Sequence, residues 1–334
     1  RCAVIGYGSW ATAIVGLLAA NEARVGWYVR NPEVLEGLLG EGRNPRYLSD
    51  VEFDRRRIAP SDDLDEVVRE ADIVILATPS AYLKTFLEPL TVSLQDKFVV
   101  SAIKGIVPGD YKTIVEYVHD RYDLSYKQIG IITGPSHAEE VSRGKLSYLT
   151  AVCADEENAR RLGGMFSSSY IRLSYSTDLY GIEYAAILKN IYALAVGIAV
   201  GLGYGDNFLA VLIANSAGEM RRFLEESYPA ERDTLVSGYL GDLLVTCYSV
   251  YSRNRRLGLL IRPDGHGLHA HIGLGHHVHG PGAREHGEVP ALAFYELLVR
   301  RALVGAAEQD YAKEKKSYAA KELVLFHNVS SLWL

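Results

Sequence analysis

The chain of 334 residues has few cysteines, no long uninterrupted apolar run and no large excess of charge of one sign. Its three cysteines, Cys2, Cys153 and Cys247, have neither disulfide-framework nor metal-ligand spacing, which favours a reducing, cytoplasmic location. The net charge of −6, with both signs mixed, argues against nucleic acid as a partner. Lys189 and Asn190 interrupt the longest apolar stretch, so we expect no membrane span.

The length is sufficient for two domains, each with its own core. No signal peptide precedes the first apolar run, and we expect a few native residues ahead of Arg1. The pattern of short apolar runs changes near Ser176 to long helical periods. We therefore predict a first domain over residues 1–176 and a second, mostly helical domain over residues 177–334.

A glycine-rich turn follows the first apolar run, Cys2–Gly6. The spacing of Gly6, Gly8 and Ala11 is G-x-G-x-x-A, and a helical pattern begins at Ala11. Gly6 suits the tight turn, Gly8 lets the backbone approach a pyrophosphate, and the helix N-terminus faces its negative charge. The alternative is an ordinary strand–helix turn. Because a strand precedes and a helix follows, the motif predicts a dinucleotide site.

The second apolar run, Arg24–Val29, ends at Arg30 and not at an acidic residue. An NAD-specific site favours Asp or Glu about 20 residues past the glycines, whereas arginine there can pair with a 2′-phosphate. The alternative for Arg30 is a solvated charge at a strand end. The sequence therefore predicts NADP(H) or NAD(H) as cofactor. Asn31 and Pro32 then predict a helix N-terminus.

Four further apolar runs end in polar or glycine-containing segments, and helical patterns separate them. This alternation predicts a mostly parallel, doubly wound α/β sheet, with ligands beyond the carboxyl ends of the strands. Lys104 directly follows one run and can point at an anion; the alternative is an exposed loop lysine. The runs are Ile73–Thr78, Phe98–Ile103, Ile129–Thr133 and Tyr148–Ala154.

Lys189 lies in a strongly apolar helical segment, among alanines three and four positions away. An unpaired buried ammonium is costly, so Lys189 either snorkels to the surface or has a partner. A desolvated lysine beside a carboxylate is a plausible acid–base catalyst, and Asp242 is a candidate partner. Asp242 could instead cap a helix that begins at Leu243. The flanking helices are expected over Asp178–Gly203 and Asn207–Glu226.

These motifs together resemble the bacterial-type NAD(P)-dependent glycerol-3-phosphate dehydrogenases. The matching stretches are GYGSWATA (6–13), AIKG (102–105), TGPSHAEEV (133–141), GIEYAAILKNIYALAVGIAVGLGYGDN (181–207) and GYLGDLLVTCYSVYSRNRRLG (238–258). The resemblance covers roughly residues 2–261. It implies reversible reduction of dihydroxyacetone phosphate to sn-glycerol 3-phosphate with NAD(P)H, feeding phospholipid synthesis in the cytoplasm. A homodimer is a reasonable expectation.

The resemblance also implies roles for individual residues. Lys189 looks like the general acid–base group at the substrate C2 oxygen. Arg253 has planar donors suited to a phosphate, although residues 253–256 could be a solvated basic turn. The substrate-binding positions are Lys104, Gly134, Ser136, Lys189, Asp242, Ser252, Arg253 and Asn254. The cofactor-binding positions are Gly6, Gly8, Ser9, Trp10, Arg30, Lys104, Ala138 and Arg253.

Residues 262–288 hold seven of the ten histidines among many glycines and show no likeness to the family. Their spacing fits no defined metal site, so we expect no metal; a flexible insertion or a frameshift explains the segment better. Two other functions stay open. One is another lysine-dependent dehydrogenase, of the β-hydroxyacid or 6-phosphogluconate type, which the serine–arginine–asparagine motif at 252–254 argues against. The other is a cofactor-binding protein inactivated by its altered C-terminus.

Overall fold

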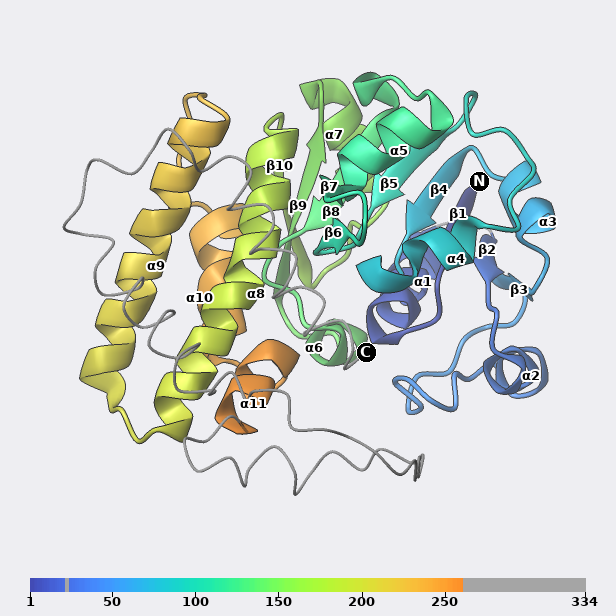
Figure 1. Cartoon of the computed structure of the whole chain (residues 1–334). Coiled ribbons are helices and arrows are strands. Elements are labelled where there is room, and N and C mark those ends of the chain that lie inside the picture. Colours follow the sequence, from blue (N-terminus) through green and yellow to red (C-terminus); the bar gives the residue numbers. More distant parts are fainter. Residues whose placement is uncertain (22–23, 261–334) are drawn as a thin grey trace, which may run out of the picture.

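The computed structural model describes residues 1–21 and 24–260, and its centre is an eight-stranded, mostly parallel sheet (Figure 1). The strand order is β10-β9-β8-β5-β4-β1-β2-β3. The six strands from β3 to β8 are parallel, β9 runs antiparallel to β8, and β10 is parallel to β9. The strands are β1 (Cys2–Ile5), β2 (Val25–Tyr28), β3 (Ile58–Ser61), β4 (Ile73–Leu76), β5 (Phe98–Ser101), β8 (Ile129–Thr133), β9 (Ser147–Cys153) and β10 (Ile171–Ser176).

Helices cover both faces of this sheet. In β1, Ala3 and Ile5 belong to one buried cluster, whereas Cys2 and Val4 belong to another, as the alternation of side chains along a strand requires. The predicted doubly wound α/β class is therefore confirmed. One cluster includes residues of α3 (Leu64–Arg69), α4 (Leu83–Leu87) and α5 (Ile114–Tyr122); the other includes residues of α1 (Ser9–Asn21), α2 (Pro32–Gly40), α6 (Ala138–Ser142) and α7 (Glu156–Gly164).

The remaining described part is helical, as predicted. Its elements are α8 (Leu179–Gly201), α9 (Asp206–Ser227), a five-residue π-helix η3 (Ser237–Gly241), α10 (Asp242–Tyr248) and α11 (Arg253–Leu260). Small elements elsewhere are the 3₁₀-helices η1 (Ser80–Tyr82) and η2 (Tyr126–Gln128) and the short strands β6 (Ile106–Val107) and β7 (Lys112–Thr113), which pair with each other.

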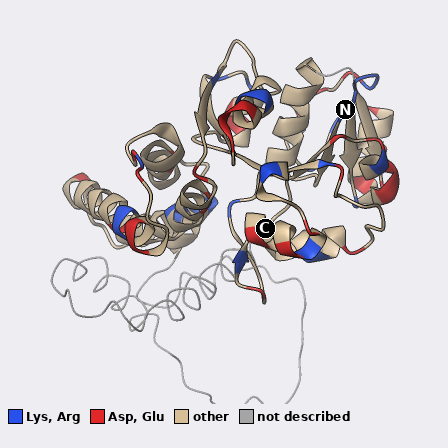
Figure 2. Cartoon of the chain, turned by 90° about the horizontal axis from the view of Figure 1, so that it is seen from above, with Lys and Arg blue, Asp and Glu red and all other residues tan. Residues whose placement is uncertain are grey.

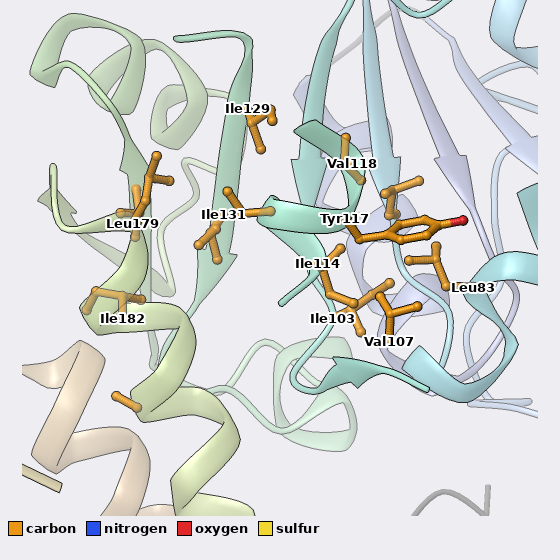
Figure 3. Close-up of a cluster of buried hydrophobic side chains, with 14 of the residues drawn as sticks. Leu83, Ile103, Val107, Ile114, Tyr117, Val118, Ile129, Ile131, Leu179 and Ile182 are labelled. Carbon is orange, nitrogen blue, oxygen red and sulfur yellow. The ribbon is translucent and has the colours of Figure 1, made fainter. Parts of the chain in front are cut away.

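Helix α8 joins the two parts through a shared core (Figure 3). Leu179 and Ile182, in its first turn, belong to the same buried cluster as Ile129 and Ile131 of β8. By length and composition α8 could cross a membrane, but 67% of its apolar window is buried inside the structure, as in the core helix of a soluble protein. Packing thus accounts for most of its apolar surface.

Helices α8 and α11 meet backbone to backbone. A Cβ atom added at Gly197 would collide with the carbonyl oxygen of Arg255, and one added at Gly258 would collide with that of Leu194. Glycine is required at both positions because no side chain fits between the helices. Charges of both signs are spread over the sheet and the helices alike (Figure 2).

Candidate active site

The turn between β1 and α1 has the geometry that its glycines predict. Gly6 has φ +127°, and a Cβ there would collide with the carbonyl oxygen of Ala77. At Gly8, by contrast, an added Cβ would have no atom within 4 Å, so its backbone faces open space. The carbonyl oxygen of Gly6 accepts a hydrogen bond of 2.7 Å from the indole of the buried Trp27, which anchors the turn.

This open turn fits the pyrophosphate of a dinucleotide. Helix α1 begins at Ser9, and the first intrahelical bond runs from the Thr12 amide to the Gly8 carbonyl. The amides of the first turn are therefore free to bind an anion. The indole Nε1 of Trp10 is buried and has no hydrogen-bond partner among the described residues, so it is a further donor at the turn.

Arg30 follows β2, as predicted, and its guanidinium is ordered against a neighbouring segment. Its Cζ lies 4.2 Å from the ring centroid of Phe86, and Nη1 donates to the Thr85 carbonyl at 3.2 Å. The side chain remains exposed, so it can reach a ligand. Asn31 caps α2 by accepting from the Val34 amide, and Pro32 opens that helix.

Three charged side chains from distant parts of the sequence meet at the carboxyl end of the sheet. Lys189 of α8 contacts Oδ1 of Asp242, and Nζ of Lys104 lies 3.1 Å from Oδ2 of the same carboxylate. Lys189 is 4% exposed and Asp242 1%. Lys189 therefore does not snorkel to the surface, and that alternative is wrong.

Asp242 is held in place by its own helix and by the end of β8. It is the first residue of α10, but its carboxylate faces the two lysines, so the alternative of a simple helix cap is wrong. Thr246 donates to the Asp242 carbonyl at 2.6 Å, and the Thr133 hydroxyl donates to Oδ2 at 3.4 Å. Around these three charged groups, Asn190 donates to the Lys104 carbonyl at 3.2 Å and so ties α8 to the loop after β5.

Burial and mutual charge set the proton affinities of this cluster. Burial lowers the pKa of Lys189 from its ordinary value; Asp242 counteracts this, while Lys104 lowers the pKa further. Burial opposes ionisation of Asp242, but Lys104 and Lys189 together bring its pKa below the usual range. The result is an ionised carboxylate shared by two ammonium groups, one of which gives up its proton more easily than a free lysine.

The segment after β8 closes one side of the cluster. Gly134 has φ +114°, and an added Cβ would lie 2.6 Å from the Tyr148 carbonyl oxygen. Its own carbonyl accepts from Lys104 at 3.2 Å and from the Ser136 hydroxyl at 3.0 Å. Ala138 is buried in the first turn of α6.

The turn before α11 carries the predicted serine, arginine and asparagine. Ser252 is buried, and its hydroxyl accepts from the Arg255 amide at 3.3 Å, so it caps α11. Arg253 is exposed, Asn254 half-buried, and neither has a hydrogen bond or ion pair within residues 1–21 and 24–260. Their donors are thus available, while Ser252 acts mainly on the helix.

Comparison with known proteins decides the family. A model described as the N-terminus of NAD-dependent glycerol-3-phosphate dehydrogenase matches residues 1–159, and one described as its C-terminus matches residues 178–284. The glycerol-3-phosphate dehydrogenase [NAD(P)+] of Pseudomonas fluorescens is 35% identical over 78% of this chain and 75% of its own length. The chain belongs to the NAD(P)-dependent glycerol-3-phosphate dehydrogenase family.

Two further relatives extend this result. The glycerol-3-phosphate dehydrogenase [NAD(P)+] of Nitratidesulfovibrio vulgaris is 36% identical over 90% of this chain and 89% of its own. The crystal structure of the glycerol-3-phosphate dehydrogenase from Coxiella burnetii shares the fold, with a TM-score of 0.73 and 22% identity over 99% of this chain and 97% of that one.

The family assignment replaces the rival dehydrogenase types. The C-terminal family model also extends to residue 284, into the histidine-rich segment where the sequence analysis found no likeness. That segment lies outside the described residues, and so does the question of metal binding by its histidines. Within the described ranges, no three His, Cys, Asp or Glu side chains are grouped to hold a metal ion.

Two dehydrogenase-site residues were missed by the sequence analysis, Thr133 and His137. Thr133 bonds the Asp242 carboxylate, and the ring centroid of His137 lies 5.8 Å from that of Tyr251, next to Ser252. Both belong to the stretch 133–141 that carried the resemblance. The available signal was their position directly after a buried strand, where ligands bind in such sheets.

Proposed function

We propose that the protein reduces dihydroxyacetone phosphate to sn-glycerol 3-phosphate, reversibly, with NADPH or NADH. The observation that carries this proposal is the buried Lys189 in contact with an ionised Asp242, beside Lys104 and within the sheet edge next to the glycine turn. Such an ammonium is held without water and has a lowered pKa, as an acid–base group requires.

The glycine turn and its surroundings hold the cofactor in this proposal. Gly6 and Gly8 provide the turn, and the first-turn amides with Ser9 and Trp10 bind the pyrophosphate. Arg30, Lys104, Ala138 and Arg253 complete the cofactor-binding set. When bound, the nicotinamide supplies the hydride that reduces the C2 carbonyl.

The chain's own residues handle charge and protons. As the C2 carbon is reduced, negative charge builds on its oxygen, and Lys189 stabilises that charge and donates its proton there. Asp242 keeps the ammonium oriented. Arg253 binds the phosphate, with neutral donors around it, and substrate binding involves Lys104, Gly134, Ser136, Lys189, Asp242, Ser252, Arg253 and Asn254.

The test is oxidation of NADPH and NADH with dihydroxyacetone phosphate, in the parent protein and in Lys189→Ala. We expect the variant to lose activity by about 10²- to 10⁴-fold while still binding cofactor. Lys97→Ala is the matched control, because Lys97 is also buried, with its Nζ on the Ala71 carbonyl at 2.9 Å, but lies outside the site. Cofactor binding by the parent without turnover would instead support the inactivated cofactor-binding protein.

Several finer points belong to the same proposal. Arg30 favours NADPH through its 2′-phosphate, which the ratio of the two KM values measures directly. We also propose a domain boundary at residues 176/177, where β10 ends and Asp178 caps α8, a cytoplasmic location, a role in phospholipid synthesis and a homodimer. Light scattering at several concentrations tests the dimer.

A further inference from the structure

His137 lies between the two halves of the site. Its ring packs against Tyr251, the residue before the Ser252–Asn254 motif, with the ring planes inclined by 52°. On the other side, Lys104, Lys189 and Asp242 are close enough for their charges to shift its pKa. A substrate that reaches from Lys189 to Arg253 therefore passes this imidazole.

The His137 side chain has no structural task that accounts for its position. The residue stands at the N-cap of α6, and its backbone carbonyl accepts from the Glu140 and Val141 amides at 3.0 Å each. The side chain makes no capping bond. Its Nε2 is buried and has no hydrogen-bond partner in the described part of the chain. Buried polar atoms are normally paired, so an unpaired one in an active site points to a ligand.

The charge state of His137 indicates which kind of ligand group it suits. Burial lowers the pKa of the imidazole, and the ammonium groups of Lys104 and Lys189 lower it further. A neutral imidazole has one N–H donor and one acceptor nitrogen. It pairs well with a hydroxyl, which can both donate and accept, and gives less to a phosphate than the guanidinium of Arg253.

Other neutral polar groups nearby are already paired. The Ser136 hydroxyl donates to the Gly134 carbonyl, the Ser252 hydroxyl accepts from the Arg255 amide, and the Asn190 amide donates to the carbonyls of Lys104 and Ala186. In the proposed reaction Lys189 takes the C2 oxygen and Arg253 the phosphate. The C1 hydroxyl of dihydroxyacetone phosphate is the polar group left over.

We infer that Nε2 of His137 hydrogen-bonds the C1 hydroxyl of the substrate and so selects a three-carbon phosphate whose far end is hydroxylated. This inference rests on the proposed function. It makes His137 a substrate-binding residue, with no part in moving the proton to the C2 oxygen.

The test compares dihydroxyacetone phosphate with hydroxyacetone phosphate, which lacks only the C1 hydroxyl. We expect the parent to prefer dihydroxyacetone phosphate in kcat/KM, because a site built to bind a hydroxyl rejects the analogue that lacks it. In His137→Leu this preference should fall by roughly ten- to a hundredfold, through loss of activity on dihydroxyacetone phosphate alone. His137→Gln, which restores a neutral donor and acceptor, should recover part of it.

His119→Asn is the matched control, since His119 also stacks on a tyrosine, Tyr126, at 4.1 Å but lies on α5 outside the site. An unchanged preference in His137→Leu would overturn the inference and leave the proposed function standing, as would its loss in Asn254→Ala instead. No turnover by the parent would overturn both. If His137→Leu does not fold, the His137 imidazole resonances of the parent serve: sn-glycerol 3-phosphate should shift them, and the absence of a shift overturns the inference.

Discussion

The glycine turn and the lysine–aspartate cluster are built in opposite ways. The turn uses five consecutive residues, Gly6–Trp10, and works through exposed backbone amides and the absence of side-chain atoms at Gly8. The cluster uses Lys104, Lys189 and Asp242, which lie far apart in the sequence, and works through buried charge. Local conformational rules specify the first, whereas only the packed fold creates the second.

This difference predicts where each part is vulnerable. In the turn, adding atoms does harm, because the ligand needs the space. In the cluster, removing a charge does harm, because a buried ammonium loses the partner that makes its burial tolerable. The following predictions test this contrast, beginning with the largest effect.

Asp242→Asn should be the most damaging substitution of similar size. It leaves the ammonium groups of Lys189 and Lys104 facing each other without a counter-charge, so the free energy of unfolding should fall by about 3–5 kcal/mol. Urea denaturation measures this. Asp120→Asn breaks an exposed ion pair with Lys112 and should not change stability measurably. Equal effects of the two substitutions would refute the contrast between turn and cluster.

Gly6→Ala and Gly8→Ala should separate stability from cofactor binding. Alanine at position 6 would be strained at φ +127° and would collide with the Ala77 carbonyl, which should cost about 1–3 kcal/mol of stability. Alanine at position 8 meets no protein atom, so stability should hold while the Kd for NADPH rises about tenfold, which is about 1.4 kcal/mol. Thermal melts and fluorescence titration measure the two effects, and a Gly8→Ala protein with unchanged Kd would contradict the role of that backbone.

The smallest effect concerns pH. Reduction needs protonated Lys189, and burial and Lys104 lower its pKa, so kcat for reduction should fall as pH rises through a value below that of a free lysine. Oxidation needs the neutral amine and should rise over the same range. Removing one of the neighbouring charges in Lys104→Gln should move the fall in reduction to higher pH by about one unit. Lys112→Gln, on the surface, should leave it in place, and an unmoved profile in Lys104→Gln would show that the lysines are not coupled.

Much of the fold could be predicted because its core strands are continuous apolar runs. The predicted strand over Ile129–Thr133 is confirmed residue for residue, and the other predicted runs contain β1, β2, β4, β5 and most of β9. Two edge strands, β3 and β10, were not predicted. β3 contains Pro60, and only the first residue of β10, Ile171, is buried, so neither has a strong apolar signal.

The site was predictable in its residue types but not in its contacts. That Lys189 had a carboxylate partner could be expected from the cost of burying it, and Asp242 was a candidate. The local pattern around Asp242 equally suited a helix cap, because a cap and an ion pair both use an aspartate at the start of a helix. The preceding π-helix, Ser237–Gly241, has no sequence signal that we can identify. His137 was missed because nothing local distinguishes a histidine facing a site from one capping a helix.

The close crossing of α8 and α11 fixes the reach of the substrate site. α8 carries the acid–base lysine and α11 begins with the proposed phosphate ligand, Arg253, while at Gly197 and Gly258 the two helices touch through their main chains. No layer of side chains lies there to change rotamer and let the helices spread. The spacing between the two helices is therefore set by peptide backbone alone, which works as a rigid gauge for the length of the phosphate ester: a molecule with one carbon more has to fold up, because the protein cannot widen.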